Sequence, residues 1–178
     1  QSFFQLYVGI GDRFFAGQQF DDNFVLFTAE AQVTGSTFLH LDGRIGQAID
    51  FGGAREADVV TLTPLARFGL GRHLRLELSD IHQTLDVAGG RLFTIDLAEL
   101  RATYQLNVRS FVRIISQYQD LERDPTLFSV PVERESRDLF NQLLFSYKIT
   151  PQTVLFLCYS DGYFGGDPSR DSLEAWDR

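Results

Sequence analysis

The sequence predicts an all-β fold, an antiparallel up-and-down meander of about nine strands, and three observations support this prediction. A short segment at residues 104–111 recurs with anchors at positions 31, 68, 104 and 147, which indicates a structural repeat of about 40 residues. Apolar and polar residues alternate on both sides of each anchor, and a period of two is typical of β-strands. Tight turns alternate with longer loops, so each repeat is expected to be a hairpin.

Each expected strand begins where this alternation begins and ends at glycine, proline or charged residues. In chain order, the expected strands are residues 2–15, 23–33, 37–49, 59–70, 73–85, 92–106, 110–120, 139–149 and 153–163. The alternation slips at residues 95–97, which predicts a β-bulge there.

Loops are expected where glycine, proline or clustered charge interrupts the alternation. The expected loops are residues 17–22, 50–58, 86–91 and 121–137, and a tail at residues 164–178 is expected to have no partner strand. Three Gly-Gly pairs mark loop tips. Because none of them opens a helix, they do not indicate phosphate-binding turns.

Alternation gives the two faces of the expected sheet different chemistry. One face is apolar, and the other is predicted to be a polar lattice. The residues of this lattice are Glu30, His40, Asp42, Arg44, Arg67, His73, Arg75, Glu77, Glu99, Arg101, Arg113 and Lys148. Their charges roughly cancel, so we expect an interior that is held by ion pairs or lined for a polar solute, without strong ion selectivity.

The apolar face is expected to contact lipid, which makes the meander part of a transmembrane outer-membrane β-barrel. The strands exceed the five or six residues usual in soluble sheets, and short turns at one end with long loops at the other are typical of such barrels. Aromatic residues expected to form interfacial girdles are Phe68, Tyr104, Tyr118, Tyr147 and Tyr159. The predicted location is the cell outer membrane of a Gram-negative bacterium, and the predicted partner is its lipid.

Composition excludes several other classes of protein. The net charge of −8 gives no electrostatic footprint for nucleic acid. Cys158 is the only cysteine, which excludes an internal disulfide and a cysteine-cluster metal site. No apolar run approaches the roughly 18 residues of a spanning helix. The 178 residues contain no methionine, so residues 1–178 are expected to be a single barrel segment that is incomplete at both ends.

No catalytic residue, metal site or cofactor is predicted. His40 and His73 share the polar face with carboxylates, but polar groups inside a barrel need such partners in any case. His82 is expected near a strand end, at the surface. Acidic residues at 161, 167 and 171 do not have the spacing of a calcium-binding loop, and an ordinary external loop is expected there.

Three segments carry a resemblance to a known family: residues 89–93, 104–111 and 140–163. They resemble the C-terminal barrel of the domain-of-unknown-function family 5916, whose members join a carbohydrate-binding-module family 9-like domain to an outer-membrane-type β-barrel. The resemblance implies a fold and a location, and no established chemistry. Cys158 stands where glycine is expected. The final strand and the carbohydrate-binding domain are missing from this sequence, so saccharide binding would belong to that missing domain.

The resulting hypothesis is a barrel segment with a role in transport, anchoring or export, and not an enzyme. The alternative is a soluble β-barrel or sandwich that binds a ligand in an apolar cavity. A third hypothesis is an outer-membrane enzyme that uses His40 or His73 with a carboxylate of the polar face.

Overall fold

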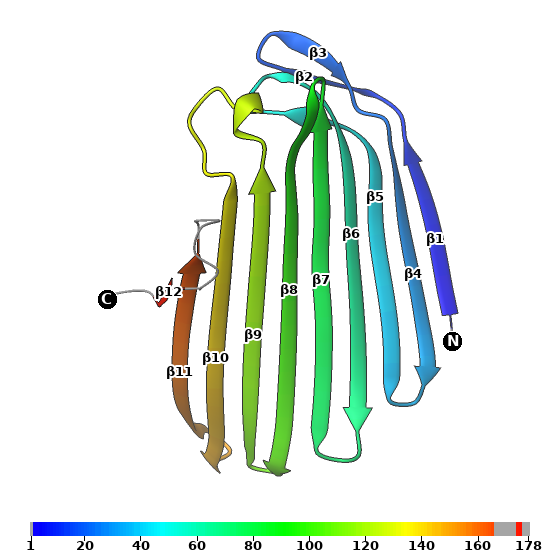
Figure 1. Ribbon diagram of the computed structural model, residues 1–178. Coiled ribbons are helices and arrows are strands. Elements are labelled where there is room, and N and C mark those ends of the chain that lie inside the picture. The colour runs from blue at the N-terminus through cyan, green and yellow to red at the C-terminus, as the bar shows by residue number, and fades with distance from the viewer. Residues whose placement is uncertain (1, 166–173, 176–178) are drawn as a thin grey trace.

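The computed structural model describes residues 2–165 and 174–175, and nearly all of them lie in β-strands (Figure 1). The strands are β1 (Ser2–Gly9), β2 (Asp12–Phe15), β3 (Gln18–Asp21), β4 (Phe24–Thr34), β5 (Thr37–Asp50), β6 (Arg55–Leu70), β7 (Leu74–Val87), β8 (Gly90–Asn107), β9 (Ser110–Arg123), β10 (Glu135–Thr150), β11 (Thr153–Gly165) and β12 (Glu174–Ala175). A 3-10 helix, η1, covers Pro125–Leu127. No helix in the described part of the chain is long and apolar enough to cross a membrane.

The main sheet contains β1 and β4 to β12 in the order in which they follow along the chain, each antiparallel to the next. The predicted all-β antiparallel meander is therefore confirmed. Tight turns lie at one end of the sheet, and the separate β2–β3 hairpin and η1 lie at the other (Figure 1). Within the described residues β1 and β12 each pair with one neighbour, so the sheet has two edges and does not close on itself.

The strands are staggered along the sheet. One row of paired residues runs Ala31, Leu39, Ala66, Leu78, Leu100, Ser116, Asn141 and Asp161. β4 ends at Thr34 shortly after Ala31, whereas β10 continues from Asn141 to Thr150. The tight turns therefore recede from the row, hairpin by hairpin, as they do where strands tilt relative to a common axis.

The two faces of the sheet differ as alternation requires. We call the face that carries Arg67 and Glu77 the inner face, because the β9–β10 loop packs on it, and the face that carries Leu78 and Leu100 the outer face. Large apolar side chains on the outer face are exposed, for example Leu100 at 39% and Ile114 at 48%. Burial is concentrated instead on the inner face, at the loop end of the sheet.

The buried cluster consists of Ala57, Val59, Leu85 and Leu92, which are 2–8% exposed. Leu127 and Phe128, at and after η1, pack against it. The nitrogen of Asp124 donates to the Leu92 carbonyl at 3.1 Å, and Arg55 donates to the Leu127 carbonyl at 2.6 Å. We call this group the loop-end cluster. Apolar burial together with these hydrogen bonds fixes the β9–β10 loop over the inner face.

The prediction of one strand at residues 2–15 is wrong. β1 ends at Gly9, which pairs with Phe24 and lies against its ring; a Cβ at Gly9 would come within 2.5 Å of that ring. The chain then turns into the β2–β3 hairpin, so the loop predicted at residues 17–22 contains β3. Phe20 of this hairpin is only 4% exposed, and its burial gives the short hairpin a reason to fold.

The bulge predicted at residues 95–97 is also misplaced. Pairing of β7 with β8 is continuous there, and the register shifts instead between Leu85 and Asp86. The alternation slips at 95–97 because polarity changes faces: Leu97 lies on the inner face and Asp96 on the outer face. A change of polarity along a strand therefore mimics a bulge in the sequence pattern.

The connections are shorter than the sequence predicts. Strand pairing reduces the loops expected at 50–58, 86–91 and 121–137 to residues 51–54, 88–89 and 124–134. The β7–β8 connection is thus as short as the tight turns of the opposite end. The prediction that the tail at residues 164–178 has no partner strand is wrong in its described part, because β12 pairs with Tyr163 and Phe164 of β11. Residues 166–173 and 176–178 of this tail lie outside the described residues.

Candidate functional site

The predicted polar lattice forms separate groups on the inner face. The central group joins three adjacent strands, because Arg67 of β6, Glu77 of β7 and Arg101 of β8 are paired in register. Glu77 accepts from Arg67 at 2.6 Å and lies 3.5 Å from Arg101. Arg101 also donates to Glu99 at 2.9 Å. One carboxylate therefore serves two guanidinium groups, a charge-assisted arrangement that holds both in place.

A second group lies on the β4–β5 hairpin. His40 lies 3.1 Å from Glu30 and 2.7 Å from Asp42 through its two ring nitrogens, and Asp42 accepts from Thr28 at 2.6 Å. Every member has a partner on the same two strands. The arrangement satisfies the polar groups of the hairpin and leaves the imidazole held at both nitrogens.

The other two histidines have different surroundings. His73 lies in the tight turn before β7 and pairs with the backbone oxygen of Gln105 at 2.7 Å, so it shares no carboxylate with His40. His82 was expected near a strand end, but it lies within β7 on the outer face, 2.6 Å from Asp96 of β8. The structure thus gives the three histidines separate environments and assembles no histidine cluster among the described residues.

Arg44 and Lys148 lie away from the central group. Arg44 of β5 donates to Asp22 at 3.3 Å and to the Gln47 carbonyl at 3.0 Å, and its guanidinium stacks 4.4 Å from the Phe24 ring centroid. Lys148 is exposed near the end of β10. The predicted lattice is therefore divided into separate groups and does not form one continuous network.

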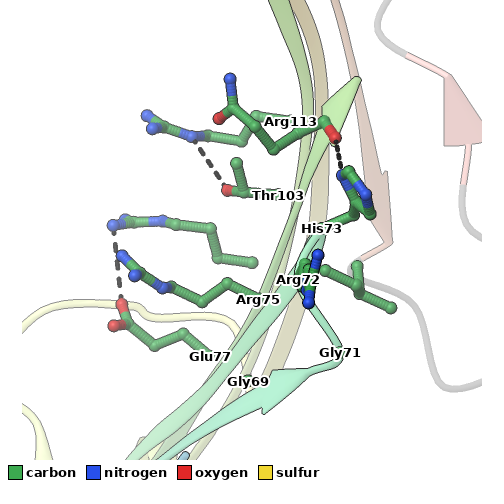
Figure 2. Close-up of a pocket in the computed structure, with 11 residues that line it drawn as sticks. Gly69, Gly71, Arg72, His73, Arg75, Glu77, Thr103 and Arg113 are labelled. Carbon is green, nitrogen blue, oxygen red and sulfur yellow. Dashed lines mark hydrogen bonds and ion pairs between the residues drawn. The ribbon is translucent and has the colours of Figure 1, made fainter. Parts of the chain in front are cut away.

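The most basic part of the inner face is a pocket at the tight-turn end, with a volume of about 410 Å³. Figure 2 shows Arg75, Thr103 and Arg113 extending from neighbouring strands to the same side of the sheet. Arg72 and Arg101 complete its set of four arginines, and Glu77 is its only carboxylate. The Nε of Arg101 is buried without a hydrogen-bond partner. We call this group the arginine pocket.

The aromatic residues predicted as girdles lie on the outer face. Phe68, Tyr104 and Tyr147 lie toward the tight-turn ends of β6, β8 and β10. Tyr118 does not align with Tyr159; it aligns through Leu139 with Tyr163, a residue that the prediction missed. Continuing the alternation of residues 155, 157 and 159 would have found it.

Metal binding has little support in the described part of the chain. No group of three or more His, Cys, Asp or Glu side chains there is arranged to hold a metal ion. The segment considered for calcium, residues 161–171, begins within β11, and most of it lies outside the described residues. Cys158 is a free, exposed thiol.

Comparison with models of protein families, with curated proteins and with solved structures finds no match to this chain.

Proposed function

We propose that this chain is a segment of an outer-membrane β-barrel, with lipid against its outer face and polar solutes against its inner face. The observation that supports the proposal best is the continuous apolar band on the outer face. Seven of its large members, each between 38% and 59% exposed, are Leu78, Leu100, Tyr104, Ile114, Leu143, Tyr147 and Leu157. An exposed apolar surface that runs across a whole sheet needs a partner, and lipid is a partner of matching chemistry and extent.

The borders of this band also support lipid as its partner. On β8 the outward residues are apolar from Ala98 to Leu106, close to the 9–11 residues that a tilted strand needs to cross a membrane. Beyond them, toward the loop end, the outward residues become ionisable, as at Asp96 and Asp58. Along β8, charge thus lies beyond the apolar stretch and not within it, as the low polarity of lipid requires.

The stagger of the strands and the polar inner face fit the same proposal. Strands tilted as these are can close into a barrel when further strands pair with the two open edges. The role that we propose for the complete barrel is transport, anchoring or export. The resemblance to family 5916 points to the same location.

The test compares one substitution on the two faces of β8. In the natural full-length protein expressed in a Gram-negative host, Leu100→Arg places a charge on the outer face. The same change at Leu97, which lies on the inner face beside Gln117 and Gln119, is the matched control. Arginine on the lipid face costs about 2–4 kcal/mol near the membrane centre. Leu100→Arg should therefore remove most of the folded protein from the outer-membrane fraction, and Leu97→Arg should remove much less.

The opposite result would favour a soluble binding module. If the protein folds in water without detergent and both variants fold equally well, the outer face does not contact lipid and the proposal is wrong. Folding is measured by resistance to protease and by whether heating changes the mobility of the protein in gel electrophoresis.

A further inference from the structure

We propose that the arginine pocket binds a small polar solute that carries an oxyanion, a phosphate or a carboxylate, on a body about the size of one sugar ring. The inference deepens the proposed function by naming the class of solute, and it rests on that proposal only for the side of the membrane that the pocket faces. The volume of the pocket, about 410 Å³, lies within the range of small-molecule sites.

The register of the sheet leaves Arg75 without a carboxylate. Its paired neighbours are Gly69 on β6 and Thr103 on β8, neither of which carries charge. Two residues along the same strand, and on the same face, Glu77 is paired with an arginine on each side. Among the described residues the Arg75 guanidinium has no ion pair, so its donors remain available to a ligand.

Arg113 continues this donor-rich surface on β9. Its Nε donates to the Thr103 hydroxyl at a long 3.4 Å, and its guanidinium lies 5.3 Å from the Phe111 ring centroid. Its cross-strand neighbours are Thr103 and Leu144, again without charge. Together with the unpartnered Nε of Arg101, the pocket offers many donors and few acceptors.

The pocket is basic although the chain as a whole is acidic. The net charge is −8, yet the lining contains four arginines and one glutamate, and that glutamate is shared with Arg67 outside the lining. Guanidinium groups present a planar fork of donors that fits phosphate and carboxylate in a bidentate manner. An oxyanion between Arg75 and Arg113 would supply the acceptors that the protein lacks there.

Gly69 and Gly71 keep the space open. No side chain projects beside Arg75 from Gly69, and a Cβ at that position would approach Ser36 to 3.3 Å. Gly71 adopts a φ of +67° in the turn that carries Arg72. This conformation suits glycine and allows the chain to turn tightly at the rim of the pocket.

The test is calorimetric titration of the full-length protein, folded in a zwitterionic detergent, with glucose 6-phosphate, glucuronate and glucose. We expect one or both of the anionic sugars to bind and glucose not to bind. Binding of only the phosphate or only the carboxylate identifies which oxyanion the pocket takes. Arg75→Gln should weaken binding at least about tenfold, the effect of removing one charge-assisted contact.

Arg91→Gln is the matched control, because it makes the same change of charge at the loop end, where Arg91 pairs with Asp86. It should leave the affinity unchanged. Arg113→Gln provides an independent measurement if Arg75→Gln folds poorly. Binding of glucose with equal affinity, no binding of either anion, or equal loss in Arg91→Gln would overturn the inference. None of these results depends on membrane location, so the failure of this inference and that of the proposed function are distinguishable.

Discussion

The two ends of the inner face are built from opposite chemistry on the same strands. β6 carries Val59 at the loop end and Arg67 at the tight-turn end, and β7 carries Leu85 and Glu77 in the same order. The apolar residues are at most 8% exposed, whereas the side chains of Arg67 and Glu77 are 49% and 22% exposed. The same strands thus have a buried apolar end at the loops, which we call the dry end, and a partly exposed charged end at the tight turns, which we call the wet end.

The two ends therefore have different roles: the loop end stabilises the fold, and the tight-turn end can bind a ligand. At the loop end, apolar burial and the anchored β9–β10 loop stabilise the sheet. At the tight-turn end, partly exposed ion pairs contribute little to stability because water screens them. Arg75 and Arg113, which form no ion pair among the described residues, remain available there for a ligand.

The largest expected effect on stability is at the dry end. Leu92→Ala removes a side chain that is 2% exposed and leaves a cavity, which typically costs about 2–5 kcal/mol. Urea unfolding in detergent measures the free energy of unfolding. Leu100→Ala on the outer face is the control for the same change in size, and it should cost clearly less because Leu100 is 39% exposed. An equal loss in both variants would show that the loop-end cluster has no special role.

A smaller effect is expected at the wet end. Glu77→Gln removes the carboxylate shared by Arg67 and Arg101, and the free energy of unfolding should fall by about 1 kcal/mol. The same change should strengthen binding of an anionic sugar, because the only carboxylate in the lining of the pocket is removed and Arg101 keeps just Glu99 as its partner. Titration of this variant measures that gain, and weaker binding would contradict the division between the two ends.

The smallest expected effect is a pH dependence at the loop end, outside the proposed membrane span. A hydrogen bond from Arg91 holds the pKa of Asp86 below its ordinary value. A lowered pKa in the folded state stabilises the protein above the pKa of the unfolded state, and this stability is lost as the pH falls through the folded value. Because 39% of the Asp86 side chain is exposed, solvent screening limits the contribution to about 0.5 kcal/mol or less.

The check is the cost of Arg91→Gln on the free energy of unfolding at two pH values. The cost should be fully present at about pH 6 and should shrink as the pH falls below the ordinary pKa of an aspartate toward the lower pKa of the folded state. A cost that is equal at both would show that the pair does not contribute through its charge.

Much of the fold could be predicted from the sequence. The alternation that contains Leu74, Leu76 and Leu78 against Arg75 and Glu77 identifies both the strand and its faces, because side chains of a strand point alternately to opposite sides. The same rule placed Arg67, Glu77 and Arg101 on one face. It failed at residues 95–97, where the two faces exchange polarity, and before Asp12, where a second short hairpin begins.

The arginine pocket could be predicted only in part. The sequence places Arg75, Arg101 and Arg113 on one face. The carboxylates expected on the same face roughly cancel their charge, so the sequence alone does not indicate a basic pocket. Only cross-strand register decides that Glu77 lies between two arginines while Arg75 lies between Gly69 and Thr103. The register of each pair depends on where the connecting turn begins and ends, which local alternation does not give to the residue.

From Phe24 onward, the long strands, their antiparallel order and most of the chemistry of each face follow from the two-residue period and the tight turns of the sequence. Tertiary structure alone decided the loop-end cluster, the anchored β9–β10 loop and the unpaired donors of the arginine pocket. The loop-end cluster joins β6 to a loop about 70 residues further along the chain, and the pocket depends on the register of four successive strands. Their energies depend on which residues meet and how much water is excluded when they do.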